Sequence, residues 1–184
     1  MDWKSFENDN QNKLESTDNK EEVYLAKFNL ALSLANQGKA REAHEILNEI
    51  DENVSKDKFI ELIKVETDKL KGSSDELLYL NYLAFTEVIK ENYQKSIIYF
   101  EDIINKDKNN VWPYNYLAAS YIEINEYERA ENIINKAREI EDNDYSRFLL
   151  GVIHYRKGSY LQAVKEFSNS GEIFRSFITE EKDE

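Results

Sequence analysis

Apolar residues recur every three to four positions along most of the chain, the spacing that gives an α-helix one apolar side. The first such stretch begins near Glu21 and ends at Gly38, because glycine readily takes the left-handed conformation that terminates helices. Further stretches of the same kind predict helices at about 40–50, 56–71, 74–90, 93–105, 111–125, 126–140, 144–157 and 159–170. The pattern predicts an all-α protein.

Part of the pattern returns at a fixed period. The small residues Ala130 and Ala163 lie 33 positions apart, and Ser96 lies 34 positions before Ala130. Such a period indicates stacked helix pairs, each burying its apolar side against the next. Because 53 positions separate Ala43 from Ser96, one additional helix is predicted at 56–71. The helix pairs themselves are predicted at about 21–52, 74–106, 111–140 and 144–171.

These pairs resemble the tetratricopeptide repeat, a helix-turn-helix unit of 34 residues. Two positions of that motif are small because the two helices of a pair cross there. They are Ala31, Ala84, Ala118 and Gly151 in the first helices, and Ala43, Ser96, Ala130 and Ala163 in the second. The turn carries Gly38, Glu91, Asn125 and Gly158, and Asn92 is expected to take the left-handed geometry in place of Glu91. The resemblance implies a short right-handed superhelix, or α-solenoid, with one additional helix.

The sequence predicts one folded domain between two tails. Residues 1–20 are polar and rich in Asn, Asp, Glu and Lys, so they are expected to be disordered. Residues 21–178 are expected to form a single tetratricopeptide-like domain, followed by an acidic tail at 179–184.

Charge and composition limit the classes of partner that the protein is expected to bind. The formal net charge is −13, so nucleic acids and anionic membrane surfaces would be repelled. No apolar run reaches the roughly 20 residues that cross a membrane. The first residues lack the apolar segment of a secretory signal, and the chain has no cysteine. A cytoplasmic location is therefore expected, without nucleic-acid binding or membrane insertion.

No motif for catalysis is present. The sequence has no glycine-rich phosphate loop and no nucleophile or metalloprotease motif. Its two histidines, His44 and His154, are far apart in sequence and leave a zinc site almost without ligands. The protein is predicted to be no enzyme and to hold no cofactor or metal.

The resemblance implies that fixed positions of each first helix line a concave groove. The groove would hold a peptide or amphipathic helix of a partner protein, with aromatic residues as anchors. The alternative is that these residues are buried core. The candidate groove residues are Phe28, Asn81, Phe85, Trp112, Asn115, Ile122, Tyr145, Phe148, Tyr155 and Arg156.

The function predicted from these features is a non-enzymatic scaffold for protein–protein interaction. One alternative is a small acidic chaperone of the secretion type. Another is self-association, in which Trp3 and Phe6 anchor the N-terminal segment in the groove of its own or a neighbouring chain, so a homo-oligomer is possible.

Overall fold

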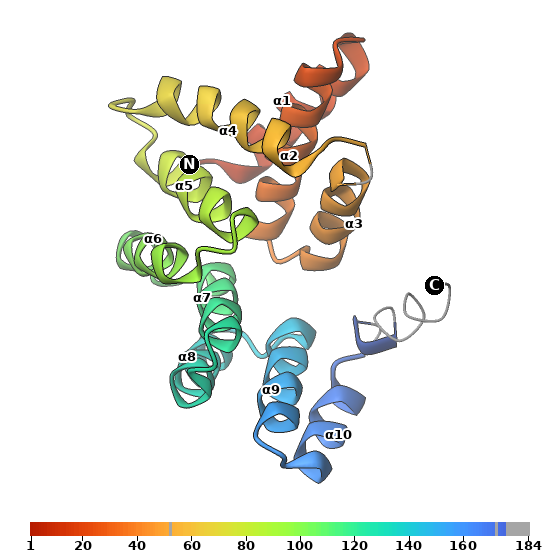
Figure 1. The fold of residues 1–184 in the computed structure, drawn as a ribbon, viewed down its shortest axis with the longest axis vertical. Coiled ribbons are helices and arrows are strands. Elements are labelled where there is room, and N and C mark those ends of the chain that lie inside the picture. Colours follow the sequence, from red (N-terminus) through yellow and green to blue (C-terminus); the bar gives the residue numbers. More distant parts are fainter. Residues whose placement is uncertain (52, 172, 176–184) are drawn as a thin grey trace. The chain divides into compact units, whose positions relative to one another are not determined.

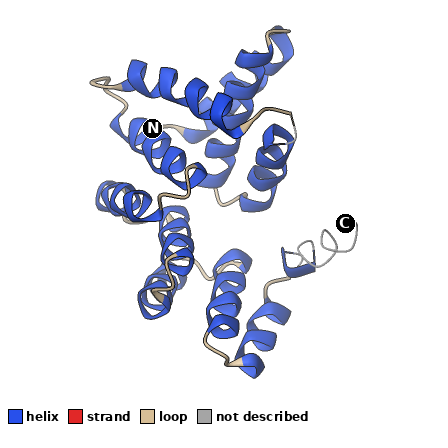
Figure 2. Ribbon diagram, in the orientation of Figure 1, coloured by secondary structure: helices blue, strands red, loops and turns tan. Residues whose placement is uncertain are grey.

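The computed structural model describes residues 1–184 with the exception of 52, 172 and 176–184. The described residues form α-helices joined by short loops, and none of them lies in a β-strand (Figure 2). The all-α prediction is therefore confirmed. The predicted acidic tail at 179–184 lies outside the described residues.

The chain divides into two compact units, residues 1–106 and 107–184. The sequence predicted one domain over 21–178, and the structure differs because a repeat contacts chiefly its neighbours, so periodicity does not fix where a chain divides. The first unit (red to green in Figure 1) contains α1 (Trp3–Ser16), α2 (Lys20–Asn36), α3 (Ala40–Asp51), α4 (Lys56–Leu70), α5 (Glu76–Ile89) and α6 (Tyr93–Lys106). The second contains α7 (Val111–Glu123), α8 (Tyr127–Ile140), α9 (Asp144–Arg156) and α10 (Tyr160–Asn169). Helices α2 to α10 occupy the predicted segments.

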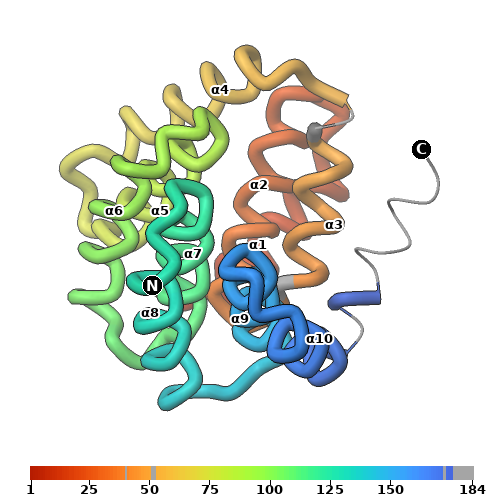
Figure 3. The backbone as a smooth tube through the Cα atoms, turned by 60° about the horizontal axis from the view of Figure 1, so that its bottom comes forward, coloured from red at the N-terminus to blue at the C-terminus, as the bar shows by residue number. Residues whose placement is uncertain are grey.

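Helix α2 is the centre of the first unit. Every residue from Leu30 to Asn36 is buried, and so is Phe28. The Phe28 ring packs edge-on against Phe59 of α4 and against Tyr82 and Phe85 of α5, with ring centroids 5.6, 5.2 and 6.3 Å away. A helix buried all round needs neighbours on every side. Helices α1 and α3 pack directly against α2 (Figure 3).

Helix α1 lies where the sequence predicted a disordered tail over residues 1–20. The Asp2 side chain caps it by accepting hydrogen bonds from two backbone amides. The helix packs against α2, yet its buried residues are the polar Glu7 and Asn10. Because the buried positions Glu7 and Asn10 are polar, and Trp3, Phe6 and Leu14 are only half-buried, the apolar periodicity that reveals other helices is weak here.

In the second unit, paired small residues let the helices of a pair cross closely. A Cβ atom added to Gly151 of α9 would lie 2.5 Å from Cδ1 of Phe167 on α10. In the other pair, Ala118 of α7 takes the place of Gly151 and Ala130 of α8 takes that of Ala163, and both are fully buried. The predicted requirement for small residues therefore has a direct steric cause.

Ion pairs between Asp142 and two arginines connect the helix ends of the second unit. Asp142 Oδ1 accepts a hydrogen bond from Nε of Arg138 at 2.8 Å, and its Oδ2 accepts one from Arg147 at 2.7 Å. These bonds, first that of Arg147, hold the pKa of the Asp142 carboxyl well below its usual range. Arg147 also donates to the carbonyl oxygen of Asn169 at 3.3 Å. The start of α9 is thereby tied to the ends of α8 and α10.

The turn of the α5–α6 pair corrects one expectation. Glu91 itself adopts the left-handed conformation, with φ of 59°, so the expectation that Asn92 takes this role is wrong. The backbone amides of Glu91 and Asn92 close the end of α5 by bonding to the carbonyl oxygens of Val88 and Glu87, both at 2.8 Å. This pattern requires the left-handed residue at position 91 whatever its side chain.

Gly151→Ala is expected to lower the free energy of unfolding by about 1–3 kcal/mol, because the new methyl group meets the Phe167 ring. Chemical denaturation measures the effect. Phe167→Leu in the Gly151→Ala background should recover part of the loss. If Gly151→Ala is instead neutral or stabilising, as helix propensity alone would give, the close crossing of α9 and α10 is wrong.

Candidate interaction surface

The ten predicted groove residues divide by burial. Tyr145 and Phe148 are half-buried, while Tyr155 and Arg156 are exposed. The other six are core residues that a partner could not reach without unfolding, and the structure thus favours the core alternative for them. They are Phe28, Asn81, Phe85, Trp112, Asn115 and Ile122, each at most 6% exposed.

The two asparagines expected to bond a partner's backbone are engaged within their own units. Asn81 accepts a hydrogen bond from the Asn36 side chain at 3.2 Å and donates to the carbonyl oxygen of Leu77 at 2.8 Å. Asn115 accepts a hydrogen bond from the Ser146 hydroxyl at 2.8 Å. Buried amides satisfied in this way stabilise the helix contacts.

The accessible remainder of the groove is a stripe along α9. Tyr145, Phe148, Val152 and Tyr155 follow one another at intervals of three or four residues, so they share one side of the helix. We call these four residues the α9 stripe. Its exposure rises along the helix, from half-buried at Tyr145 to 58% at Tyr155, and Arg156 lies at its exposed end.

Aromatic contacts hold the buried end of the α9 stripe in place. The Tyr145 ring lies 6.2 Å from that of Trp112 and 6.4 Å from that of Tyr116, and Phe148 lies 5.8 Å from Phe167. Burial raises the pKa of the Tyr145 phenol to about 12, so it stays neutral at physiological pH. The stripe therefore presents preformed apolar side chains.

A second exposed apolar group was not predicted. Tyr160, Leu161 and Val164 of α10 are 63%, 91% and 62% exposed, and we call them the α10 face. The Tyr160 ring lies 5.7 Å from that of Tyr155, at the exposed end of the α9 stripe. An alignment of the helix pairs could have revealed this group. Leu161 is apolar at the position where the other pairs carry Arg41, Gln94 and Glu128.

The predicted anchors of the N-terminal segment lie on the first unit. The rings of Trp3 and Phe6 are half-buried and 6.1 Å apart. The Trp3 carbonyl oxygen accepts hydrogen bonds from the Ser33 hydroxyl and, at 3.4 Å, from the Gln37 side chain. The segment thus lies along the side of α2 that carries Ser33 and Gln37.

Polar contacts around Glu7 hold α1 to α2. The Glu7 carboxylate accepts a hydrogen bond from Gln37 at 2.8 Å and lies 3.1 and 3.5 Å from the ammonium groups of Lys4 and Lys39. Burial raises the pKa of Glu7, but the hydrogen bonds and the two cations outweigh it and lower the pKa below 4.5. Farther along α1, Asn10 accepts a hydrogen bond from Asn29 at 3.1 Å.

No helix in the described part of the chain is long and apolar enough to cross a membrane.

Comparison with known proteins identifies the repeat. The family model described as Tetratricopeptide repeat matches residues 99–132, which run from within α6 through α7 into α8. This part of the chain is therefore similar to one tetratricopeptide repeat. The matched segment includes the small residues Ala118 and Ala130 on which the resemblance was based. No curated protein sequence matches the chain.

Solved structures of MamA proteins are similar to this chain in fold. MamA 41-end from Desulfovibrio magneticus RS-1 has a TM-score of 0.56 at 15% identity, covering 95% of this chain and 96% of that one. The MamA RS-1 ArsTM double mutant gives 0.55 at 16%, covering 95% of both chains. MamA MSR-1 C2 gives 0.53 at 11%, covering 95% and 88%. At these identities the similarity establishes the helical-repeat fold and nothing more specific.

Glu7→Gln is expected to speed hydrogen exchange of the α1 amides at pH 7, because the neutral amide loses both ion pairs. Since the folded pKa is lowered, the stabilisation by ionised Glu7 is present above the ordinary value of 4.5 and is lost as the pH falls through the folded pKa. The difference between variant and wild type should therefore shrink in acid. Asp9→Asn, at an exposed position of the same helix, is the matched control. Equal exchange in the two variants at pH 7 would refute this role of Glu7.

Proposed function

We propose that the protein is an interaction scaffold that binds a short apolar segment of a partner along the α9 stripe. The observation that carries the proposal is the partial exposure of four apolar side chains on one side of α9. The tetratricopeptide repeat is a protein-binding fold, which agrees with this role.

The chemistry of the α9 stripe suits an apolar segment. Tyrosine and phenylalanine bury large areas with few rotatable bonds, so they are common anchors at interfaces. The Tyr145 ring packs against Trp112 and Tyr116, and the Phe148 ring packs against Phe167. Because these rings are already held in place, binding costs less side-chain conformational entropy. Arg156 at the exposed end can bond a carboxylate or a carbonyl oxygen of the bound segment.

The site is narrower than the predicted groove. Phe85 and Trp112 are 4% and 2% exposed, so they support the helices beneath rather than contact a partner. Their replacement would lower stability before it changed recognition. Substitutions that test binding must therefore be made at the exposed end of the α9 stripe.

Val152→Ser combined with Tyr155→Ser is expected to weaken capture of a partner by at least about 30-fold, the effect of losing roughly 2 kcal/mol of binding free energy at an anchor. The partner is first identified by affinity purification with the wild-type chain, and its binding is then measured by calorimetry with purified proteins. Helicity should be unchanged, because Tyr155 is 58% exposed and Val152 is only partly buried.

The matched control is Val65→Ser combined with Ile98→Ser, which removes apolar side chains that are both 55% exposed on α4 and α6 of the first unit. This variant should bind the partner as the wild type does. Equal binding by the α9 variant and the wild type would contradict the proposal.

A further inference from the structure

Helix α1 is held in the first unit differently from the helices that follow it. Its fully buried side chains are Glu7 and Asn10, whereas each of the other helices in the described part of the chain buries at least one apolar side chain. Its apolar residues Trp3, Phe6 and Leu14 are only half-buried. Burial of apolar surface is the main force that holds helices together. Helix α1 therefore depends more than the other helices on polar contacts.

A row of polar residues on α2 makes these contacts. Asn29, Ser33 and Gln37 recur at intervals of four, so they share one side of α2, and we call them the α2 row. The Ser33 hydroxyl and the Gln37 amide both donate to the Trp3 carbonyl oxygen. The Asn29 amide donates to the Asn10 side chain at 3.1 Å. Because each bond joins a particular donor to a particular acceptor, the α2 row fixes one position of α1 along α2.

One member of the α2 row also links α1 to the core. Asn29 Oδ1 accepts a hydrogen bond from the Tyr82 hydroxyl of α5, while its Nδ2 donates to Asn10. Asn10 in turn donates to the carbonyl oxygen of Phe6 at 2.8 Å. Tyr82 is 2% exposed, and burial raises the pKa of its phenol well above the usual value, so the hydroxyl keeps the proton that it donates. A continuous path of hydrogen bonds thus runs from α5 through α2 to α1.

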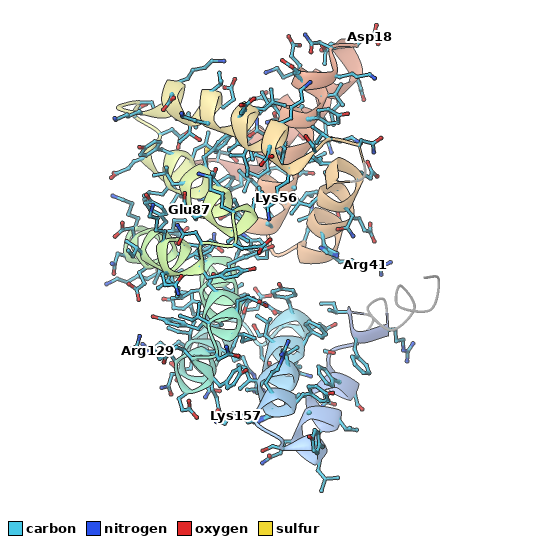
Figure 4. The ribbon with its side chains drawn as sticks, viewed as in Figure 1. Asp18, Arg41, Lys56, Glu87, Arg129 and Lys157 are labelled. Atoms are coloured by element: carbon cyan, nitrogen blue, oxygen red, sulfur yellow. The ribbon has the colours of Figure 1, made fainter. Side chains whose placement is uncertain are left out.

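Helices α1 and α2 can keep their own structure when they separate. The Asp2 side chain caps α1 and the Asn19 side chain caps α2, so neither helix takes its N-terminal hydrogen bonds from the other. Residues 17–19 join them, and Asp18 (labelled in Figure 4) is exposed in this connection. The ring cluster around Phe28 is built from α2, α4 and α5. Because water can take over the hydrogen bonds of the α2 row, α1 can withdraw while this cluster stays packed.

We propose that α1 is a strap that opens and redocks on α2 as one element while the rest of the first unit stays folded. In the closed state it fills the α2 row with Glu7 and Asn10 and keeps other helices off that side of α2. In the open state the row fits a helix that presents Glu and Asn three positions apart, as α1 does. A purely apolar helix fits poorly, because it would leave the polar groups of the row buried without partners.

The test supplies α1 a second time, as a labelled synthetic peptide of residues 1–18, and measures its binding to the full-length protein by fluorescence anisotropy. The wild type should bind the peptide weakly, because its own tethered α1 has a high effective concentration at the row. Glu7→Ala combined with Asn10→Ala in the protein loosens α1 and leaves the row intact. This variant should bind the peptide at least about 10-fold more tightly than the wild type does. A peptide with the same two substitutions is the control and should bind neither protein.

Hydrogen exchange of the full-length protein tests the same opening without a substitution in α1. The α1 amides of the wild type should exchange at least about 10-fold faster than the amides of the buried segment 30–36 of α2. Tyr82→Phe should speed exchange of the α1 amides further, although Tyr82 reaches α1 only through Asn29. Tyr99→Phe, which removes a hydroxyl from a half-buried tyrosine of α6, should leave α1 exchange unchanged.

Three results would overturn the proposal. The first is equal affinity of the wild type and the Glu7/Asn10 variant for the peptide. The second is exchange of the α1 amides at the rate of the buried α2 amides, which would make α1 a fixed part of the unit. The third is sedimentation that shows a dimer of the wild type and a monomer of the Glu7/Asn10 variant, because the row would then hold α1 of a second copy.

Discussion

The close crossing of two helices at paired small residues is the constraint on which the structure depends. All eight of these positions are buried, from Ala31 and Ala43 in the first pair to Gly151 and Ala163 in the last. Where the backbones approach this closely, large residues pack above and below the crossing, as Phe167 does over Gly151. The helices of a pair are thus fixed in one arrangement, and the sides that they turn to their neighbours follow from it.

This arrangement decides which aromatic residues can take part in binding. Phe28 is surrounded by Phe59, Tyr82 and Phe85, so it stabilises the first unit. Trp112 packs against Tyr116 and Tyr145. The most exposed apolar side chains lie on the last pair, in the α9 stripe and the α10 face. The two surfaces meet where Tyr155 contacts Tyr160.

The sequence sufficed for features that depend on local rules. Helix positions follow from apolar spacing, and the crossings follow from small residues such as Ala118 and Ala130. Burial of Phe85 and Asn81 could not be predicted, because a position in the repeat does not reveal how many helices surround it. Helix α1 was missed because its fully buried positions, Glu7 and Asn10, are polar and break the apolar pattern between Phe6 and Leu14. The exposure of Leu161 required the structure, although its departure from Arg41, Gln94 and Glu128 was visible in the sequence.

The central claim is that the most exposed apolar side chains lie on the α9–α10 pair, while the predicted groove residues of the other helices are buried core. Carbene footprinting of the full-length protein, read residue by residue by mass spectrometry, tests it most directly. We expect strong labelling of Tyr155, Tyr160, Leu161 and Val164, and little labelling of Phe28, Phe85 and Trp112. Labelling of Phe85 and Trp112 as strong as that of Tyr160 would contradict the account.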